Sequence, residues 1–129
     1  MEKVVIIVRG LQGSGKSTVG KLFNTKAICS ADDYFMRGGT YRWYGAGLTA
    51  AHVWCIRKCR RFMKKQAPRI VIDNTAVKAR DLVPYNDLAR QFGYVVHTII
   101  VENRHGGVNS HGVPEEAIER LKAKFDVKL

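Results

Sequence analysis

Cysteines, acidic residues and long apolar runs are all scarce in this chain of 129 residues. Three cysteines are too few, and an odd number, for the disulfide framework of a small secreted protein, so we expect a reducing, cytoplasmic setting. No apolar run approaches the roughly 20 residues that a helix needs to cross a bilayer, so we expect no membrane partner. The apolar segment at residues 4–8 is too short for the core of a signal peptide, and we expect none.

The scarcity of acidic residues leaves a large positive charge. The chain has 22 Lys and Arg against 11 Asp and Glu, which gives a formal net charge of +11. A small-metabolite enzyme has no need of this charge, whereas a protein that holds a polyphosphate strand gains affinity when Lys and Arg contacts release condensed counterions. Nucleic acid is therefore the expected partner, although charge that serves solubility or reflects lineage would give the same composition.

A phosphate-binding motif occupies residues 10–17. The sequence Gly-Leu-Gln-Gly-Ser-Gly-Lys-Ser matches the pattern GxxxxGK[ST] and directly follows the apolar segment 4–8. Glycines let successive backbone N–H groups converge on phosphate oxygens, Lys16 adds a positive charge, and the Ser17 hydroxyl is a natural Mg²⁺ ligand. The motif predicts a nucleoside triphosphate site, with ATP and Mg²⁺ as cofactors. The expected contacts are Gly13, Ser14, Gly15, Lys16, Ser17 and Thr18.

The chain has no internal repeat, low-complexity tract or linker, and its length suffices for one hydrophobic core, so we expect one domain over residues 1–129. Strand-like and helix-like stretches alternate, which predicts a parallel sheet covered on both faces. The expected strands are 4–8, 27–30, 69–72 and 94–101, and the expected helices are 14–24, 49–66, 78–92 and 114–125. We expect an α/β fold with a loop at 34–47, a kink or break at Pro84, and a helix end at Gly93.

Carboxylates follow two of the expected strands. One of Asp32 and Asp33, after the second strand, can accept the proton of an acceptor hydroxyl that attacks the γ-phosphate; the alternative is a helix or turn cap. Asp73 ends the third strand, as the Mg²⁺-supporting Asp of phosphate-loop enzymes does; the alternative is a structural loop contact. Because ligands of parallel sheets bind at the carboxyl ends of the strands, we expect these carboxylates beside the phosphate loop.

Other segments suggest an acceptor side. Residues 34–44 interleave aromatic rings with arginines, as a single-stranded nucleic-acid groove requires; the alternative is a hydrophobic cluster under a loop. Residues 57–69 contain seven cations and no acidic residue. These cations either follow a phosphate backbone or form a solvated face. Arg104 is the expected lid residue that neutralises charge on the transferred phosphoryl group, unless its segment is an ordinary loop. The expected acceptor contacts are Tyr34, Arg37, Tyr41, Arg42, Trp43 and Asp73.

A zinc site is the less favoured interpretation of His52, Cys55 and Cys59, which share one face of the expected helix. Structural zinc sites usually draw ligands from across a turn, and no fourth ligand is evident here. We expect these three residues to be small buried residues on the core side.

Several blocks of sequence occur in an order that resembles a known family. After the phosphate loop come Ser-Ala-Asp-Asp-Tyr-Phe at 30–35, Ile-Asp-Asn-Thr at 72–75 and His-Gly-Val-Pro at 111–114. This order resembles the 5′-hydroxyl polynucleotide kinases of the phosphate-loop superfamily, in particular the AAA-like kinase domain of phage end-healing enzymes. With this resemblance we expect a single-domain α/β P-loop kinase fold with strand order 2-3-1-4. The resemblance implies transfer of the γ-phosphate of ATP to a 5′-OH end of DNA or RNA. It also implies that Asp32 is the general base, that Lys16 and Ser17 contact phosphate and Mg²⁺, and that Asp73 supports the acceptor.

The chain departs from that family at two positions. Phage-type relatives carry an Arg where this chain has Phe35, so Arg37 or Arg42 is expected to replace it. An Arg usually precedes the Asn ahead of the last block, where this chain has Val108, which leaves Arg104 as a displaced candidate. A phosphatase or ligase partner would be a separate chain. Two other functions fit these residues: a small-metabolite or nucleoside kinase, and a non-catalytic nucleic-acid-binding module gated by nucleotide.

Overall fold

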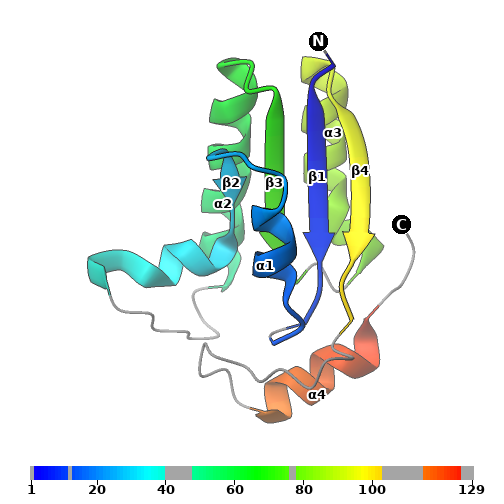
Figure 1. Ribbon diagram of the computed structural model, residues 1–129. Helices are drawn as coiled ribbons and strands as arrows, with labels where there is room; N and C mark the ends of the chain where they lie inside the picture. The colour runs from blue at the N-terminus through cyan, green and yellow to red at the C-terminus, as the bar shows by residue number, and fades with distance from the viewer. Residues whose placement is uncertain (1, 12, 40–47, 76–77, 103–114, 126–129) are drawn as a thin grey trace.

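Four parallel strands form the centre of the computed structural model, which describes residues 2–11, 13–39, 48–75, 78–102 and 115–125 (Figure 1). The strands are β1 (Val4–Arg9), β2 (Ile28–Cys29), β3 (Arg69–Asn74) and β4 (Val95–Ile100). Their order across the sheet is β2-β3-β1-β4, which confirms the predicted order 2-3-1-4. The two central strands pair from Val4 opposite Arg69 to Arg9 opposite Asn74.

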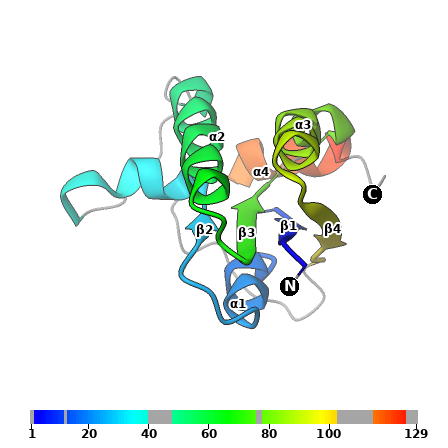
Figure 2. The same cartoon turned by 90° about the horizontal axis from the view of Figure 1, so that it is seen from above.

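Helices cover both faces of this sheet. The helices are α1 (Lys16–Lys21), α2 (Leu48–Lys64), α3 (Val83–Phe92) and α4 (Glu115–Lys124). Figure 2 shows α2 and α3 on one face and α1 on the other. In Figure 1, α4 lies beyond the carboxyl ends of the strands. Within the described part of the chain, no helix combines the length and apolar character needed to cross a bilayer.

The hydrophobic core is larger on the face covered by α2 and α3. The predicted apolar positions of α2 are mostly buried there, whereas Phe62 is only partly buried. The buried residues that α2 contributes are Ala51, Cys55, Cys59 and Met63. On the α1 face a smaller cluster forms around Ile6, Val8 and Val71. The sheet and α2 therefore form the rigid support on which the candidate site is built.

Several elements differ from their predicted bounds. The helix after the phosphate loop begins at Lys16 instead of residue 14, because Gly15 has a φ of 95° and cannot continue a right-handed helix. The predicted loop at 34–47 starts as a 3-10 helix, η1 (Ala31–Gly39), and its residues 40–47 lie outside the described part. Strand β3 continues past residue 72, because Asp73 and Asn74 still pair with β1.

The predicted break near Pro84 is present. A short 3-10 helix, η3 (Ala79–Leu82), precedes α3, and Pro84 lies in the first turn of α3, where its missing N–H costs no helical hydrogen bond. Gly93 ends α3 with a φ of 77°, as expected for a left-handed cap.

Candidate functional site

The carboxyl ends of β1, β2 and β3 bring the predicted site residues to one edge of the sheet. The phosphate loop follows β1, η1 with Asp32 and Asp33 follows β2, and Asp73 and Asn74 end β3. Parallel strands place their carboxyl ends together, which is why three segments far apart in sequence meet here. The structure thus brings the predicted nucleotide and base residues together; their roles remain predictions.

The phosphate loop depends on glycine at the positions where its backbone turns or is crowded. Gly13 and Gly15 have φ values of 85° and 95°, which residues with a Cβ rarely adopt. A Cβ on Gly10 would lie 2.5 Å from Ser14 Oγ and 2.9 Å from the Val101 carbonyl oxygen, closer than real contacts allow. Gln12 lies outside the described residues. The loop is therefore specified by backbone geometry as much as by side chains.

The charged residues of the loop differ in exposure. Lys16 is only 4% exposed although it carries a charge. Ser17 and Thr18 are exposed at the start of α1, where their hydroxyls are accessible to a ligand. A buried ammonium group next to an accessible hydroxyl is the pair that triphosphate and metal binding require.

Asp73 is a buried carboxylate with an unused oxygen. It is 5% exposed, and its Oδ1 has no hydrogen-bond partner among the described residues. Burial raises the pKa of Asp73, while the charge of Lys16 and a hydrogen bond with Ser17 lower it. A buried acceptor without a partner is costly, so this oxygen is suited to a ligand that brings positive charge. Carboxylate and hydroxyl oxygens are ligands that Mg²⁺ prefers, so Asp73 and Ser17 fit this ion.

Asn74 ties the base-bearing segment to the sheet, a role that the sequence did not reveal. Its Oδ1 accepts the backbone N–H of Ala31 at 2.8 Å. Its Nδ2 donates to Tyr85 Oη at 3.2 Å and to Cys55 Sγ at 3.5 Å. Since Ala31 directly precedes Asp32, these bonds connect β3, α2 and α3 to the start of η1.

The two consecutive aspartates have different surroundings. Asp32 is partly buried, whereas Asp33 is exposed and its Oδ2 lies 3.9 Å from Lys58 Nζ. Partial burial raises the pKa of Asp33, with Lys58 opposing and Asp32 adding to this shift. Lys58 Nζ also lies 5.3 Å from the ring centre of Trp54. Asp33 is thus paired with a lysine of α2, and Asp32 stays the predicted base.

The described part of the predicted acceptor segment packs against α2. The Tyr34 ring contacts Phe35 and Trp54 edge-on, with centroid separations of 5.6 and 6.1 Å. Phe35, which stands where the resembled family has an Arg, is buried in the core. Of Arg37 the structure describes only the backbone, within η1. Four predicted residues lie outside the described part, namely Tyr41, Arg42, Trp43 and Arg104.

The three cysteines are structural thiols. Cys29, Cys55 and Cys59 are free and buried, and burial raises the pKa of Cys55 to about 11. The prediction that His52 is buried with them is wrong, because His52 is exposed on the outer side of α2. Within the described ranges, no group of three or more His, Cys, Asp or Glu residues could hold a metal ion. Thiolate chemistry is therefore not part of the candidate site.

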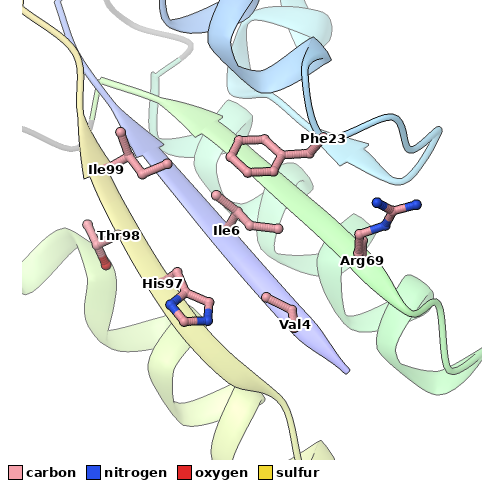
Figure 3. A pocket seen from close by; sticks show the side chains of 7 residues that line it. All are labelled: Val4, Ile6, Phe23, Arg69, His97, Thr98 and Ile99. Atoms are coloured by element: carbon pink, nitrogen blue, oxygen red, sulfur yellow. The ribbon is translucent and has the colours of Figure 1, made fainter. Parts of the chain in front are cut away.

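A hollow of about 510 Å³ lies on the α1 face of the sheet (Figure 3). Its floor is apolar, and Arg69 of β3 and His97 of β4 flank it. It is lined by Val4, Ile6, Phe23, Arg69, His97, Thr98 and Ile99. Val4 and Arg69 are the first residues of their strands, so the hollow lies toward the amino edge and is separate from the candidate site.

The parallel sheet of order 2-3-1-4, with a phosphate loop after its first strand, defines a P-loop kinase-like fold. The chain belongs to the AAA domain family, whose profile matches residues 5–127. It is 34% identical over 129 residues to human NEDD4-binding protein 2, with 92% of this chain covered. The chain spans only 7% of the length of that relative.

Solved structures share this fold at low sequence identity. One is the Pnkp1/Rnl/Hen1 complex, with a TM-score of 0.60 and 17% identity, covering 99% of this chain and 41% of that one. Another is the APS kinase CysC of Mycobacterium tuberculosis in complex with AMPPNP and APS, with a TM-score of 0.53 and 15% identity. That match covers 95% of this chain and 70% of the kinase. These likenesses confirm the predicted fold class.

Proposed function

We propose that this chain is an ATP-dependent kinase that transfers the γ-phosphate to a 5′-OH end of DNA or RNA. The observation that carries the proposal is the carboxyl edge of the sheet, where buried Lys16, the Ser17 hydroxyl and the unused oxygen of Asp73 lie with the segment of Asp32. Phosphoryl transfer needs little covalent chemistry from the protein, but it needs charge and geometry of this kind at one place.

Each residue has a distinct part in the proposed reaction. Lys16 and the loop N–H groups hold the β- and γ-phosphates. Ser17, with Asp73 in support, would hold Mg²⁺, which offsets phosphate charge when it is bound. Asp32 accepts the proton of the acceptor hydroxyl while its oxygen bonds to the γ-phosphorus. The bond from that phosphorus to the bridging oxygen of the β-phosphate breaks, and ADP leaves.

Charge and aromatic residues favour a polynucleotide as the acceptor. A net charge of +11 exceeds what a small metabolite needs and suits a strand of phosphates. On the acceptor side we propose Tyr34, in contact with Trp54, together with Arg37, Tyr41, Arg42 and Trp43. Arg104 is proposed to neutralise charge on the transferred group.

Labelled ATP tests the proposal directly. The protein and Mg²⁺ are incubated with γ-labelled ATP and a panel of 5′-OH oligodeoxynucleotides, 5′-OH oligoribonucleotides, nucleosides and APS. We expect label on the oligonucleotides. Asp32→Asn should slow transfer at least about 100-fold without weakening ATP binding. The matched variant Asp33→Asn should retain transfer, because Asp33 is exposed and pairs with Lys58.

Two other results would each refute the proposed acceptor. Label on nucleosides or APS alone would indicate a small-molecule kinase, a function that the likeness to APS kinase favours. ATP and oligonucleotide binding without transfer to any acceptor would indicate a non-catalytic, nucleotide-gated binding module.

A further inference from the structure

The outer side of α2 is strongly basic. Five cations of α2 and of the residue directly after it are exposed, namely Arg57, Arg60, Arg61, Lys64 and Lys65, here called the α2 cations. Within the described ranges none of them forms an ion pair with a carboxylate; the pairs present join Lys58 to Asp33 and Arg90 to Asp87. Like charges three or four residues apart on a helix repel one another, so a bound polyanion would relieve this repulsion.

The α2 cations lead away from the candidate site. Near the site, Lys58 approaches Asp33 within 3.9 Å. The other end of α2, at Lys64, is followed five residues later by Arg69, the first residue of β3, at the amino edge of the sheet (Figure 1). At 1.5 Å per residue, the α2 cations extend over about 12 Å. The α2 cations therefore extend from the carboxyl edge of the sheet, where the candidate site lies, toward the amino edge.

Building on the proposed function, we propose that the α2 cations bind the backbone phosphates of the acceptor strand downstream of its 5′ end. The 5′-OH lies at Asp32, and the strand continues along the outer side of α2 toward Lys65. Along the axis of a stacked strand, phosphates recur about every 3.4 Å, so about 12 Å accommodates three or four of them. Contacts of this kind raise the affinity for longer acceptors without any sequence preference.

The opposite side of α2 makes this surface separable from the site. Ala51, Cys55, Cys59 and Met63 hold α2 against the sheet and are buried, whereas the α2 cations project into solvent. Substitution of two α2 cations that lie far from Asp32 along α2 removes positive charge, while the core contacts of the helix remain. A loss of affinity that depends on acceptor length then reports on the strand-binding surface alone.

The test compares Arg61→Gln/Lys64→Gln with the control Lys21→Gln/Lys26→Gln. The control removes two exposed charges from α1 and the residues after it, on the other face of the sheet (Figure 2). Binding of 5′-OH thymidylate strands of 2, 4, 8 and 12 nucleotides is measured by fluorescence anisotropy. Phosphoryl transfer to the same strands is measured with labelled ATP. Wild-type affinity should rise with length and level off by about six nucleotides, as expected for three or four contacted phosphates.

The expected loss follows from counterion release. Each single-strand phosphate contact releases about 0.7 ion, which corresponds to about fivefold in affinity at 0.1 M salt. Arg61→Gln/Lys64→Gln should therefore weaken binding of the 12-mer about 25-fold and lower the salt slope by about 1.4. The dinucleotide should lose less than about twofold, since it does not reach these positions. The control should bind all strands like the wild type.

Three outcomes would overturn the proposal. The first is that Arg61→Gln/Lys64→Gln weakens the affinity for the dinucleotide and for the 12-mer equally. The second is that the control loses as much affinity for the 12-mer as Arg61→Gln/Lys64→Gln does. The third is that the wild-type protein binds phosphatidylserine vesicles but not the 12-mer. A length-dependent loss in Arg61→Gln/Lys64→Gln without transfer to any 5′-OH would refute the kinase function and uphold the strand-binding surface.

Discussion

Replacement of Asn74 by alanine tests the link between the sheet and the segment that carries Asp32. The Asn74 amide is buried and bonds to the Ala31 N–H, the Tyr85 hydroxyl and the Cys55 thiol. Asn74→Ala removes all three hydrogen bonds. All three partners belong to buried residues, but the bonds to the Ala31 N–H at 2.8 Å and the Tyr85 hydroxyl at 3.2 Å matter most, because a thiol sulfur is a weak acceptor.

The expected cost follows from these two groups. A buried group left without its partner costs about 1–3 kcal/mol, so the two groups together should lower the free energy of unfolding of Asn74→Ala by about 2–6 kcal/mol. Tyr85→Phe is the matched control, because it removes one partner of Asn74 and keeps the bond to Ala31; we expect a cost of about 1–2 kcal/mol. With a urea m-value of about 2 kcal/mol/M, the unfolding midpoint should fall by about 1–3 M in Asn74→Ala and by about 0.5–1 M in Tyr85→Phe.

Activity separates a positioning role from a purely structural one. Asn74→Ala should lower kcat for transfer about 100-fold, because a displacement of about 1 Å at a reacting group has an effect of that size. The KM for ATP should not change, since the hydrogen bonds of Asn74 lead to η1, α2 and α3 and not to the phosphate loop. Tyr85→Phe should keep kcat within about twofold of the wild type, because Ala31 stays bonded.

Urea titrations and steady-state kinetics are made on the same preparations, at a temperature at which both variants are folded. If the unfolding midpoint of Asn74→Ala equals that of Tyr85→Phe, the bond to Ala31 contributes nothing to stability. If the two variants have the same kcat, Asn74 does not position Asp32.

Three further substitutions probe other parts of the site. Burial raises the pKa of Asp73 and so penalises its ionised form in the folded state; Asp73→Asn should therefore stabilise the ligand-free protein at pH 8 while weakening Mg²⁺–ATP binding. The stability difference between Asp73→Asn and the wild type should shrink as pH falls through the raised pKa of Asp73, and it should vanish below the ordinary pKa of an Asp carboxyl. Thermal melts at pH 8 and pH 3.5 measure this difference. A difference that does not depend on pH would contradict burial of the Asp73 carboxylate as its cause. Gly10→Ala should cost about 1–3 kcal/mol and weaken ATP binding, because its Cβ collides with Ser14 and the Val101 carbonyl; a titration with wild-type affinity would refute the crowding. Asp32→Asn should slow transfer at least about 100-fold with an unchanged Kd for ATP, and rapid transfer by this variant would exclude Asp32 as the base.

The features predicted best from the sequence are those that local patterns encode. The phosphate loop is a contiguous run whose glycines and Lys16 have a fixed spacing, so its place after β1 follows directly. The apolar runs mark the strands, and the break at Pro84 follows from the missing N–H of proline. The order of the strands in the sheet is confirmed as well.

The features that the sequence did not reveal depend on contacts between distant residues. Asn74 reaches Ala31 across 43 positions, and no periodicity encodes that hydrogen bond. The pairing of Lys58 with Asp33 separates this lysine from the exposed cations of α2, although all belong to one basic run. His52 was expected among buried cysteines because helical spacing alone does not show where the core ends.

Transfer of label from γ-labelled ATP to a 12-nucleotide strand tests the central claim most directly. Two strands of identical sequence are compared, one with a 5′-OH and one with a 5′-phosphate, in the presence of Mg²⁺. The proposed kinase should label the first strand at its 5′ end and leave the second unlabelled, because only the first offers a 5′ hydroxyl to Asp32. Equal labelling of both strands, or label on neither, would contradict the proposed function.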